Sequence, residues 1–287
     1  MYPASFEYHR PATVDEAVRL LGTHKDDAKL LAGGHSLIPL MKLRLTTPKH
    51  VIDLRRVTGL SGIREEGGTI VIGALTTHYA VESNASVKAK CPILAEAAAM
   101  IGDPQVRNWG TIGGSVAHAD PAADWPAVIL ALGGELRVTG PKGTRTIKVE
   151  DFFKDVMTTA LGPDEVLTEI RIPALASGSG TAYVKHPHPA SRFAVVGVAA
   201  ILTVSGGTCR KASVAVTGVG PKASRARGVE AALQGKSLDA QTIAAAAQKA
   251  ADGIEMNADL QGPVEYKQHL TRVYARRALE AAAGRAK

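Results

Sequence analysis

Residues 29–42 read KLLAGGHSLIPLMK, and residues 111–126 read TIGGSVAHADPAADWP. In each stretch a Gly-Gly pair precedes a hydroxyl residue, and the residues that follow can start a helix. Gly lacks a Cβ and tolerates positive φ, so consecutive peptide N–H groups can converge on one anion. A helix N-terminus behind them adds a favourable dipole. Two turns of this kind facing each other predict a cradle for two phosphates.

Other nucleotide and nucleophile motifs are incomplete. No G-x-G-x-x-G follows a strand, so a Rossmann site is not indicated. Glu230 occupies the position where a P-loop ending in Gly235-Lys236-Ser237 would need glycine. Neither long stretch completes the G-x-S-x-G elbow of hydrolases. The three remaining Gly-Gly pairs, at 67–68, 133–134 and 206–207, are typical of ordinary turns.

Composition limits the class of protein. A chain of 287 residues suggests two domains. The net charge of +7 is scattered along the chain and only 4% of residues are aromatic, so nucleic-acid binding is not expected. Two cysteines provide neither a disulfide framework nor the four thiolates of an iron–sulfur cluster. The N-terminus lacks a secretory pattern and the longest apolar run, 193–204, is too short to span a bilayer, so we expect a cytoplasmic protein.

The hydrophobic pattern predicts an α+β fold. Thr13 and Glu16 form a capping box before a helix that runs to Gly22, and short strands over 28–31 and 50–54 complete a β-α-β-like unit. Mixed helices and strands continue to Pro173, with a helix over 124–132 and a hairpin over 135–149. Small residues at 174–180 indicate a domain boundary.

Beyond this boundary, strands over 181–186, 193–204 and 209–217 predict a three-stranded antiparallel sheet. Helices over 227–233, 239–251 and 264–283 are expected to pack as a three-helix bundle on it. The last helix has a predicted apolar face of Tyr266, Leu270, Val273, Tyr274 and Leu279.

Isolated polar residues leave alternatives open. His186 and His188 could ligate a metal, but a surface turn is the better interpretation because no carboxylate or thiol is near in sequence. His118 and Asp120, just after the second Gly pair, suit helix capping, phosphate contacts or catalysis. Asp124 precedes a helix and is equally well read as an N-cap or as a ligand contact.

The two Gly-rich stretches resemble the paired flavin-binding motifs of the medium, FAD-carrying subunit of molybdenum hydroxylases. Carbon monoxide dehydrogenase medium subunits are the most similar type within this family. The resemblance includes FEYHRPATVDEAVRLL near the start, VIDLRRVTGLSGI, and GPDEVLTEIRIP. It implies a two-subdomain FAD-binding domain of the vanillyl-alcohol-oxidase-like (PCMH) type over 1–175, with subdomains of about 1–57 and 58–175. A smaller C-terminal α+β domain of the carbon monoxide dehydrogenase flavoprotein type would occupy 176–287.

The resemblance also implies the cofactor site. The FAD pyrophosphate is expected on the peptide N–H groups of 32–36 and 111–115, the flavin sugar or ribityl hydroxyls near Asp124, and the ring near Ile101, Leu167, Lys185 and Phe193. Phe193 replaces a hydroxyl-bearing aromatic of some relatives. The predicted cofactor-binding residues are Ala32, Gly33, Gly34, His35, Ser36, Leu37, Ile101, Thr111, Gly113, Gly114, Ser115, His118, Asp124, Leu167, Lys185 and Phe193.

The implied activity is electron transfer without a catalytic side chain or a metal in this chain. Electrons would arrive from [2Fe-2S] clusters on a small subunit, after oxidation of substrate at a molybdopterin cofactor on a large subunit, in a dimer of heterotrimers. FAD would pass them to an external acceptor. The alternatives are a stand-alone FAD oxidase or dehydrogenase, a medium subunit for xanthine, an aldehyde or an N-heterocycle, and a noncatalytic nucleotide-binding module. No transmembrane segment is expected, although the complex could associate peripherally with a membrane.

Overall fold

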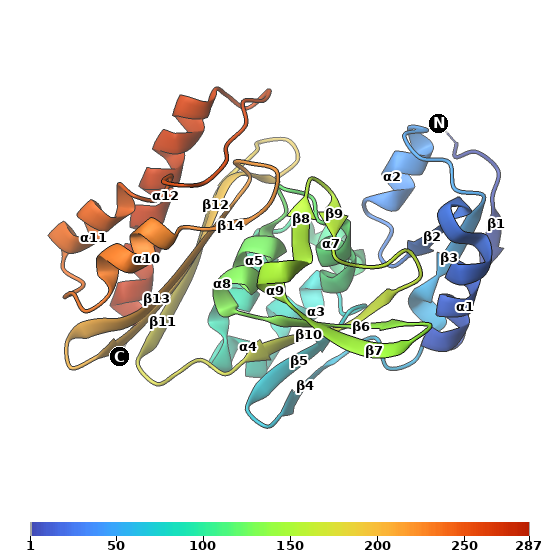
Figure 1. Cartoon of the computed structure of the whole chain (residues 1–287), viewed down its shortest axis with the longest axis horizontal. Helices are drawn as coiled ribbons and strands as arrows, with labels where there is room; N and C mark the ends of the chain where they lie inside the picture. Colours follow the sequence, from blue (N-terminus) through green and yellow to red (C-terminus); the bar gives the residue numbers. More distant parts are fainter. Residues whose placement is uncertain (1, 287) are drawn as a thin grey trace.

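The N-terminal part of the chain is a parallel sheet with one covering helix. In the computed structural model, which describes residues 2–286, this sheet has the order β1-β3-β2, with β1 Glu7–His9, β2 Ala28–Leu31 and β3 His50–Asp53 (Figure 1). Helix α1, Val14–His24, begins where Thr13 Oγ1 accepts a hydrogen bond from the Glu16 amide at 3.1 Å. The Glu16 carboxylate accepts from the Ala12 amide at 2.8 Å, so both halves of the capping box are occupied.

The middle of the chain forms an antiparallel five-stranded sheet in the order β4-β5-β10-β6-β7. Its strands are β4 Ile63–Glu66, β5 Thr69–Gly73, β6 Glu135–Gly140, β7 Gly143–Lys148 and β10 Val166–Pro173. Its helices are α3 His78–Ser83, α4 Ala85–Lys90, α5 Pro92–Met100, α6 Pro104–Trp109, α7 Ile112–His118, α8 Asp124–Leu132 and α9 Val149–Phe152. The apolar helix α8 is buried along its whole length because the middle sheet and the C-terminal sheet both pack on it.

Short elements complete this region. They are α2 Leu37–Lys42, the 3-10 turns η1 Lys25–Asp27 and η2 Leu54–Arg56, and the two-stranded pair β8 Phe153–Asp155 and β9 Thr158–Thr159. The Gly pairs at 67–68 and 206–207 have positive φ at all four positions and form hairpin turns, as predicted. Gly133 has a φ of 64° and ends α8 in the left-handed conformation.

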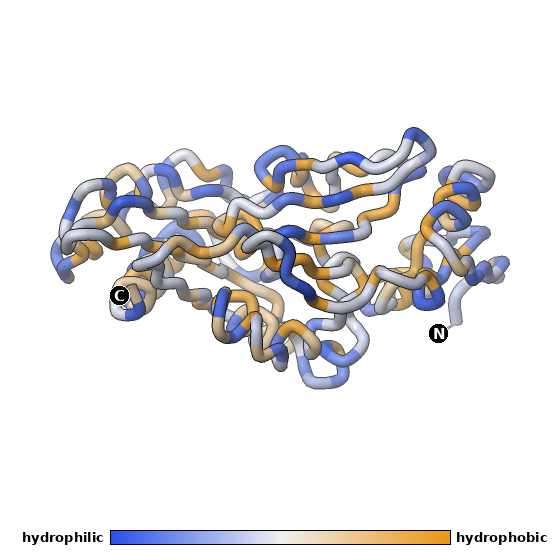
Figure 2. Tube along the Cα trace, turned by 90° about the horizontal axis from the view of Figure 1, so that it is seen from below, coloured by the Kyte–Doolittle hydropathy of each residue, from blue (hydrophilic) through white to orange (hydrophobic). Residues whose placement is uncertain are grey.

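The C-terminal sheet has four strands in the order β11-β12-β13-β14. The three predicted strands are present as β11 Ser179–Pro187, β12 Ala194–Ser205 and β13 Thr208–Thr217, and the two-residue β14 Ser224–Arg225 adds a fourth. Helices α5 and α8 pack on this sheet, and so do α10 Arg227–Leu233 and the long α12 Val264–Arg285, with α11 Ala240–Ala247 against α10 and α12 (Figure 1). Several hairpin and loop tips are hydrophilic, whereas hydrophobic and hydrophilic positions are interspersed along the helices and strands (Figure 2).

The predicted apolar face of α12 is partly wrong. Leu270 and Leu279 are buried, but Tyr266 is 40% exposed. The buried side instead carries small residues, Ala275, Ala278 and Ala282, because they let the helix approach β11 and β12 closely. An added Cβ at Gly180 of β11 would lie 2.0 Å from the carbonyl oxygen of Ala282, so this contact requires glycine.

The α+β prediction is confirmed by the mixed sheets and helices. Domain boundaries near residues 57 and 175, the second of which lies between β10 and β11, remain our proposal. Among residues 2–286, no helix has the length and apolar character needed to cross a bilayer.

Candidate functional site

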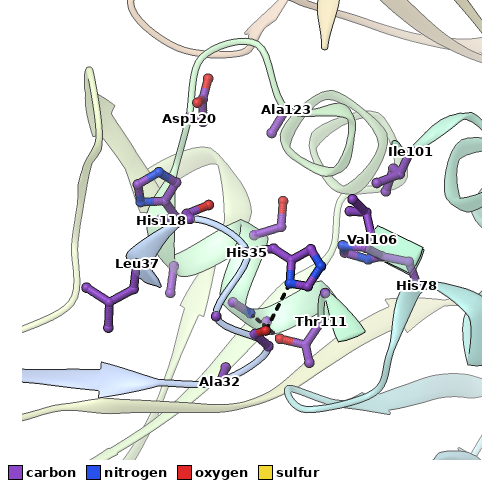
Figure 3. Close-up of a pocket in the computed structure, with 18 of the residues that line it drawn as sticks. Ala32, His35, Leu37, His78, Ile101, Val106, Thr111, His118, Asp120 and Ala123 are labelled. Atoms are coloured by element: carbon purple, nitrogen blue, oxygen red, sulfur yellow. Dashed lines mark hydrogen bonds between the residues drawn. The ribbon is translucent and has the colours of Figure 1, made fainter. Parts of the chain in front are cut away.

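One cavity of about 520 Å³ lies where the N-terminal sheet, the middle helices and the loop after β11 meet. This volume is within the range typical of cofactor sites, roughly 300 to 1,000 Å³. All of the predicted cofactor-binding residues except Lys185 line it. Segments separated by up to 161 residues of sequence, from Ala32 to Phe193, therefore line one space. Figure 3 shows residues from several of these segments, among them Ala32, Thr111 and Asp120.

The first Gly turn is a loop at the carboxyl end of β2. Gly34 has a φ of 77°, and an added Cβ would lie 2.6 Å from the Ile38 side chain. His35 Nδ1 is 3.0 Å from the Gly33 carbonyl, which can only accept, so this nitrogen carries the proton (Figure 3). Within the described residues, the peptide N–H groups of residues 33–36 have no protein acceptor. They are free to bind an anion.

The second Gly pair is the first turn of α7 and differs from the first. Its amides are occupied: Ile112 donates to the Thr76 carbonyl, Gly113 to the Ala74 carbonyl at 2.9 Å, Gly114 to Thr111 Oγ1 at 3.1 Å, and Ser115 to the Thr111 carbonyl. The prediction that both turns present converging amides therefore fails for the second turn. Gly113 is needed for packing instead, because an added Cβ would lie 2.4 Å from Ala74. Thr111 keeps its hydroxyl proton for a ligand, since its oxygen is the acceptor for Gly114.

The two turns touch through backbone. A Cβ added at Gly33 would lie 2.1 Å from the Trp109 carbonyl oxygen and 2.8 Å from the Gly110 Cα. The β-bridge between Thr77 and Thr111 and the hydrogen bond from the His78 amide to the Gly110 carbonyl fix the other side of this segment. The predicted facing of the two turns is confirmed, and Gly33 is the residue that permits it.

Asp124 lines the cavity but is not an N-cap. The helix α8 begins at Asp124 itself, and Ala123 is its N-cap. The carboxylate is 5% exposed and accepts hydrogen bonds from the Tyr183 hydroxyl and from Lys185 Nζ at 3.0 Å. Burial raises the pKa of Asp124 and lowers that of Lys185, and their ion pair opposes both shifts.

Lys185 is not among the cavity-lining residues, so it affects the cavity only through the residues to which it donates hydrogen bonds. Its ammonium donates to Asp124, to the Met100 carbonyl at 2.8 Å and to the Arg192 carbonyl at 2.8 Å. These are the three donors that an ammonium has. The side chain therefore ties the end of α5, the start of α8 and the loop before β12 together beside the cavity.

The structure adds His78, which the sequence analysis missed. His78 is 4% exposed and lines the cavity (Figure 3). Its Nδ1 accepts a hydrogen bond from Trp125 Nε1 at 3.1 Å. Because indole nitrogen only donates, the neutral imidazole of His78 carries its proton on Nε2. Burial, with smaller effects of His35 and Arg107, lowers the pKa of His78 to about 4. Trp125 lies 47 residues from His78 in sequence, so no local sequence pattern predicts that the two side chains meet.

The remaining candidates have separate roles. Asp120 lines the cavity while Oδ1 accepts from the Ala122 amide at 2.9 Å, and His118 lies beside it (Figure 3). His188 Nδ1 accepts a hydrogen bond from the Ser191 amide at 3.1 Å and so stabilises a turn, which is the interpretation that the sequence favoured over metal binding. His186 contacts the Tyr274 hydroxyl. Phe193 is 43% exposed and Ile101 half-buried at the cavity.

Comparison with known proteins identifies the family. Residues 4–175 match the FAD binding domain in molybdopterin dehydrogenase, and residues 181–282 match the CO dehydrogenase flavoprotein C-terminal domain. The chain belongs to the FAD-binding flavoproteins of the molybdopterin dehydrogenases. It is thus a flavoprotein subunit of the oxidoreductase class.

Individual members of this flavoprotein family align along the whole chain. The carbon monoxide dehydrogenase medium chain of Hydrogenophaga pseudoflava is 46% identical over 98% of both chains. That of Afipia carboxidovorans is 43% identical over 100% of both chains. The structure of the Hydrogenophaga pseudoflava carbon monoxide dehydrogenase that lacks the Mo-pyranopterin moiety superposes with a TM-score of 0.97, at 47% identity and full coverage of both chains.

We predict that Lys185→Met lowers the free energy of unfolding by about 3–5 kcal/mol, because it leaves the buried Asp124 carboxylate without its cation. Urea denaturation of the FAD-free chain, followed by circular dichroism, measures this change. Lys211→Met, an exposed position on β13, is the matched control and should shift stability by less than about 0.5 kcal/mol. Equal effects of the two substitutions would contradict the role assigned to Lys185.

A second prediction concerns pH. The pKa of His78 is about 4 when folded and about 6.5 when unfolded, so between these values the unfolded chain binds the additional proton. Stability is unaffected by this group above pH 6.5 and falls as the pH is lowered towards 4, by about 3 kcal/mol in total. Comparison of urea midpoints at pH 7.5 and 4.5 should show a smaller loss for His78→Gln than for the parent. His269→Gln, an exposed control on α12, should retain the parent's loss.

Proposed function

We propose that this chain is the FAD-carrying electron-transfer subunit of a molybdenum hydroxylase of the carbon monoxide dehydrogenase type. The observation that carries the proposal is a single cavity lined both by residues 33–36, whose amides are free, and by the apolar side chains of Ile101, Leu167 and Phe193. An anion-binding loop and an apolar compartment in one space suit a molecule with a pyrophosphate and a flat aromatic ring. Full-length similarity to carbon monoxide dehydrogenase medium chains supports the enzyme type.

The residues present divide the work of holding FAD. The amides of 33–36 and the hydroxyls of Thr111 and Ser115 would bind the phosphates, and the Nε2–H of His78 is a further neutral donor at the cavity. Asp124, held in place by Lys185 and Tyr183, would accept hydrogen bonds from ligand hydroxyls. FAD supplies the redox chemistry when bound, and the protein supplies binding, orientation and electrostatics.

The cysteines support a role for partner subunits. Cys91 and Cys209 are both buried, and burial raises the pKa of Cys91 to about 12, so neither is a ready metal-binding thiolate. Two thiols are too few for a [2Fe-2S] cluster. We therefore place the clusters on a small iron–sulfur subunit and substrate oxidation on a large molybdopterin subunit, in a dimer of heterotrimers. Ile38, Leu43 and Leu45 are exposed on and just after α2, and these exposed apolar side chains support burial against another chain. A cytoplasmic location remains part of the prediction.

Gly33→Ala should weaken FAD binding by about tenfold or more, because the new Cβ would push the 32–36 loop off Trp109 and Gly110. Fluorescence titration of the flavin-free chain with FAD measures the loss. Gly284→Ala on α12, where an added Cβ meets nothing within 4 Å, is the matched control and should bind like the parent. Unchanged affinity of Gly33→Ala would place the cofactor elsewhere.

The proposed electron flow is tested with the FAD-loaded chain under anaerobic conditions. The flavin absorbance of the isolated chain should not bleach with carbon monoxide, an aldehyde or a purine, because substrate oxidation is assigned to another subunit. It should bleach when the iron–sulfur and molybdopterin subunits are added together with carbon monoxide. Reduction of the isolated chain by dithionite is the control that its flavin is reducible. Rapid substrate-dependent bleaching of the isolated chain would favour a stand-alone oxidase.

A further inference from the structure

Three histidines meet at the N-terminal sheet, among residues that do not line the FAD cavity. His9 ends β1, His50 begins β3 and His24 is the last residue of α1. Their ring centroids are 5.1 Å apart for His9 and His24, 5.3 Å for His9 and His50, and 3.6 Å for His24 and His50. All three are half-buried, so solvent ions reach them. Parallel pairing of β1 with β3 and the return of α1 over the sheet create this cluster.

The spacing of the ring nitrogens suits one metal ion. Each ring offers a nitrogen within 4.8 Å of the other two, and His9 Nε2 lies 3.1 Å from His50 Nδ1. Ligand nitrogens of a tetrahedral zinc site, with Zn–N distances of about 2.0–2.1 Å, lie about 3.4 Å apart. The rings of His24 and His50 are stacked with an interplanar angle of 24°, so His24, at a helix end, has to turn about χ1 and χ2 to direct a nitrogen at the ion.

The surroundings add negative charge. The Glu7 carboxylate, on the exposed strand β1, is 3.4 Å from His50 Nδ1 and can turn to provide an oxygen ligand. The carbonyl end of α1 carries a partial negative charge that favours a cation next to His24. Three imidazoles and one carboxylate match the ligands that zinc and its neighbours in the first transition series prefer.

We propose that His9, His24 and His50 bind one divalent transition-metal ion of the zinc type, with Glu7 as fourth ligand. The ion would hold the three-residue strand β1 and the end of α1 against β3, the central strand of the N-terminal sheet. The neighbouring strand β2 of this sheet leads into the loop of residues 32–36. Its role would be structural, because these residues are not among those that line the FAD cavity.

The test uses the FAD-loaded full-length chain after removal of metals with a chelator. Calorimetric titration with Zn²⁺ should show one site with a Kd below about 10 µM, and Co²⁺ should give the intense visible absorption of a tetrahedral site. His24→Gln and His50→Gln should each weaken Zn²⁺ binding by at least tenfold and abolish the Co²⁺ bands. His269→Gln on α12 should leave both unchanged.

Stability provides a second readout. Saturating Zn²⁺ should raise the Tm of the parent and of His269→Gln, and should not raise that of His24→Gln. Flavin absorbance and circular dichroism identify variants that remain folded, and Glu7→Gln, an exposed change, tests the site without altering an imidazole. No saturable single-site binding by the parent, or equal affinity in His24→Gln and the parent, would overturn the proposal.

Discussion

The buried ion pair between Asp124 and Lys185 joins the parts of the molecule that form the cavity. Lys185 lies on the C-terminal sheet, whereas Asp124 begins α8 and Met100 ends α5 in the middle of the chain. A buried ammonium is tolerated only when its donors are satisfied, and here all three have acceptors. The orientation of Asp124, the position of the loop around Arg192 and the packing of the two sheets are thus coupled. A change in any one of them would leave a buried polar group of this cluster without a hydrogen-bond partner.

The contact between Gly33 and the Trp109–Gly110 backbone imposes the second constraint. It brings the loop of the N-terminal sheet against the entry of α7, and side chains at position 33 would separate them. Arg55 reinforces this junction from the N-terminal side, because it forms an ion pair with buried Asp53 and lies 5.8 Å from the Trp109 ring. Hydrogen bonds from Arg55 and from the Tyr8 hydroxyl hold the pKa of Asp53 below its usual value although burial opposes them.

The cavity is lined by both polar and apolar groups. The free amides of residues 33–36 provide partial positive charge, and neutral His78 adds a hydrogen-bond donor without adding a full charge. The apolar side chains of Ile101, Leu167 and Phe193 come from three different elements or loops. Tuning of a redox group by dipoles and burial needs such a fixed arrangement, which the surrounding sheets supply.

Local sequence was sufficient for the elements and for the type of cofactor. Helix 124–132 and the strands around it were predictable because hydrophobic periodicity and capping act over a few residues. The two Gly-rich stretches resemble flavin-binding motifs, and the family match to an FAD binding domain agrees with that prediction of the cofactor. Tertiary structure decided what depends on distant partners. Only the fold pairs the amides of Ile112 and Gly113 with the carbonyls of Thr76 and Ala74. It also places Lys185 behind Asp124 and sets the tautomer of His78 through Trp125. The cluster of His9, His24 and His50 likewise forms only in the folded chain. Each of these is a contact between segments brought together by packing, and no short-range pattern encodes it.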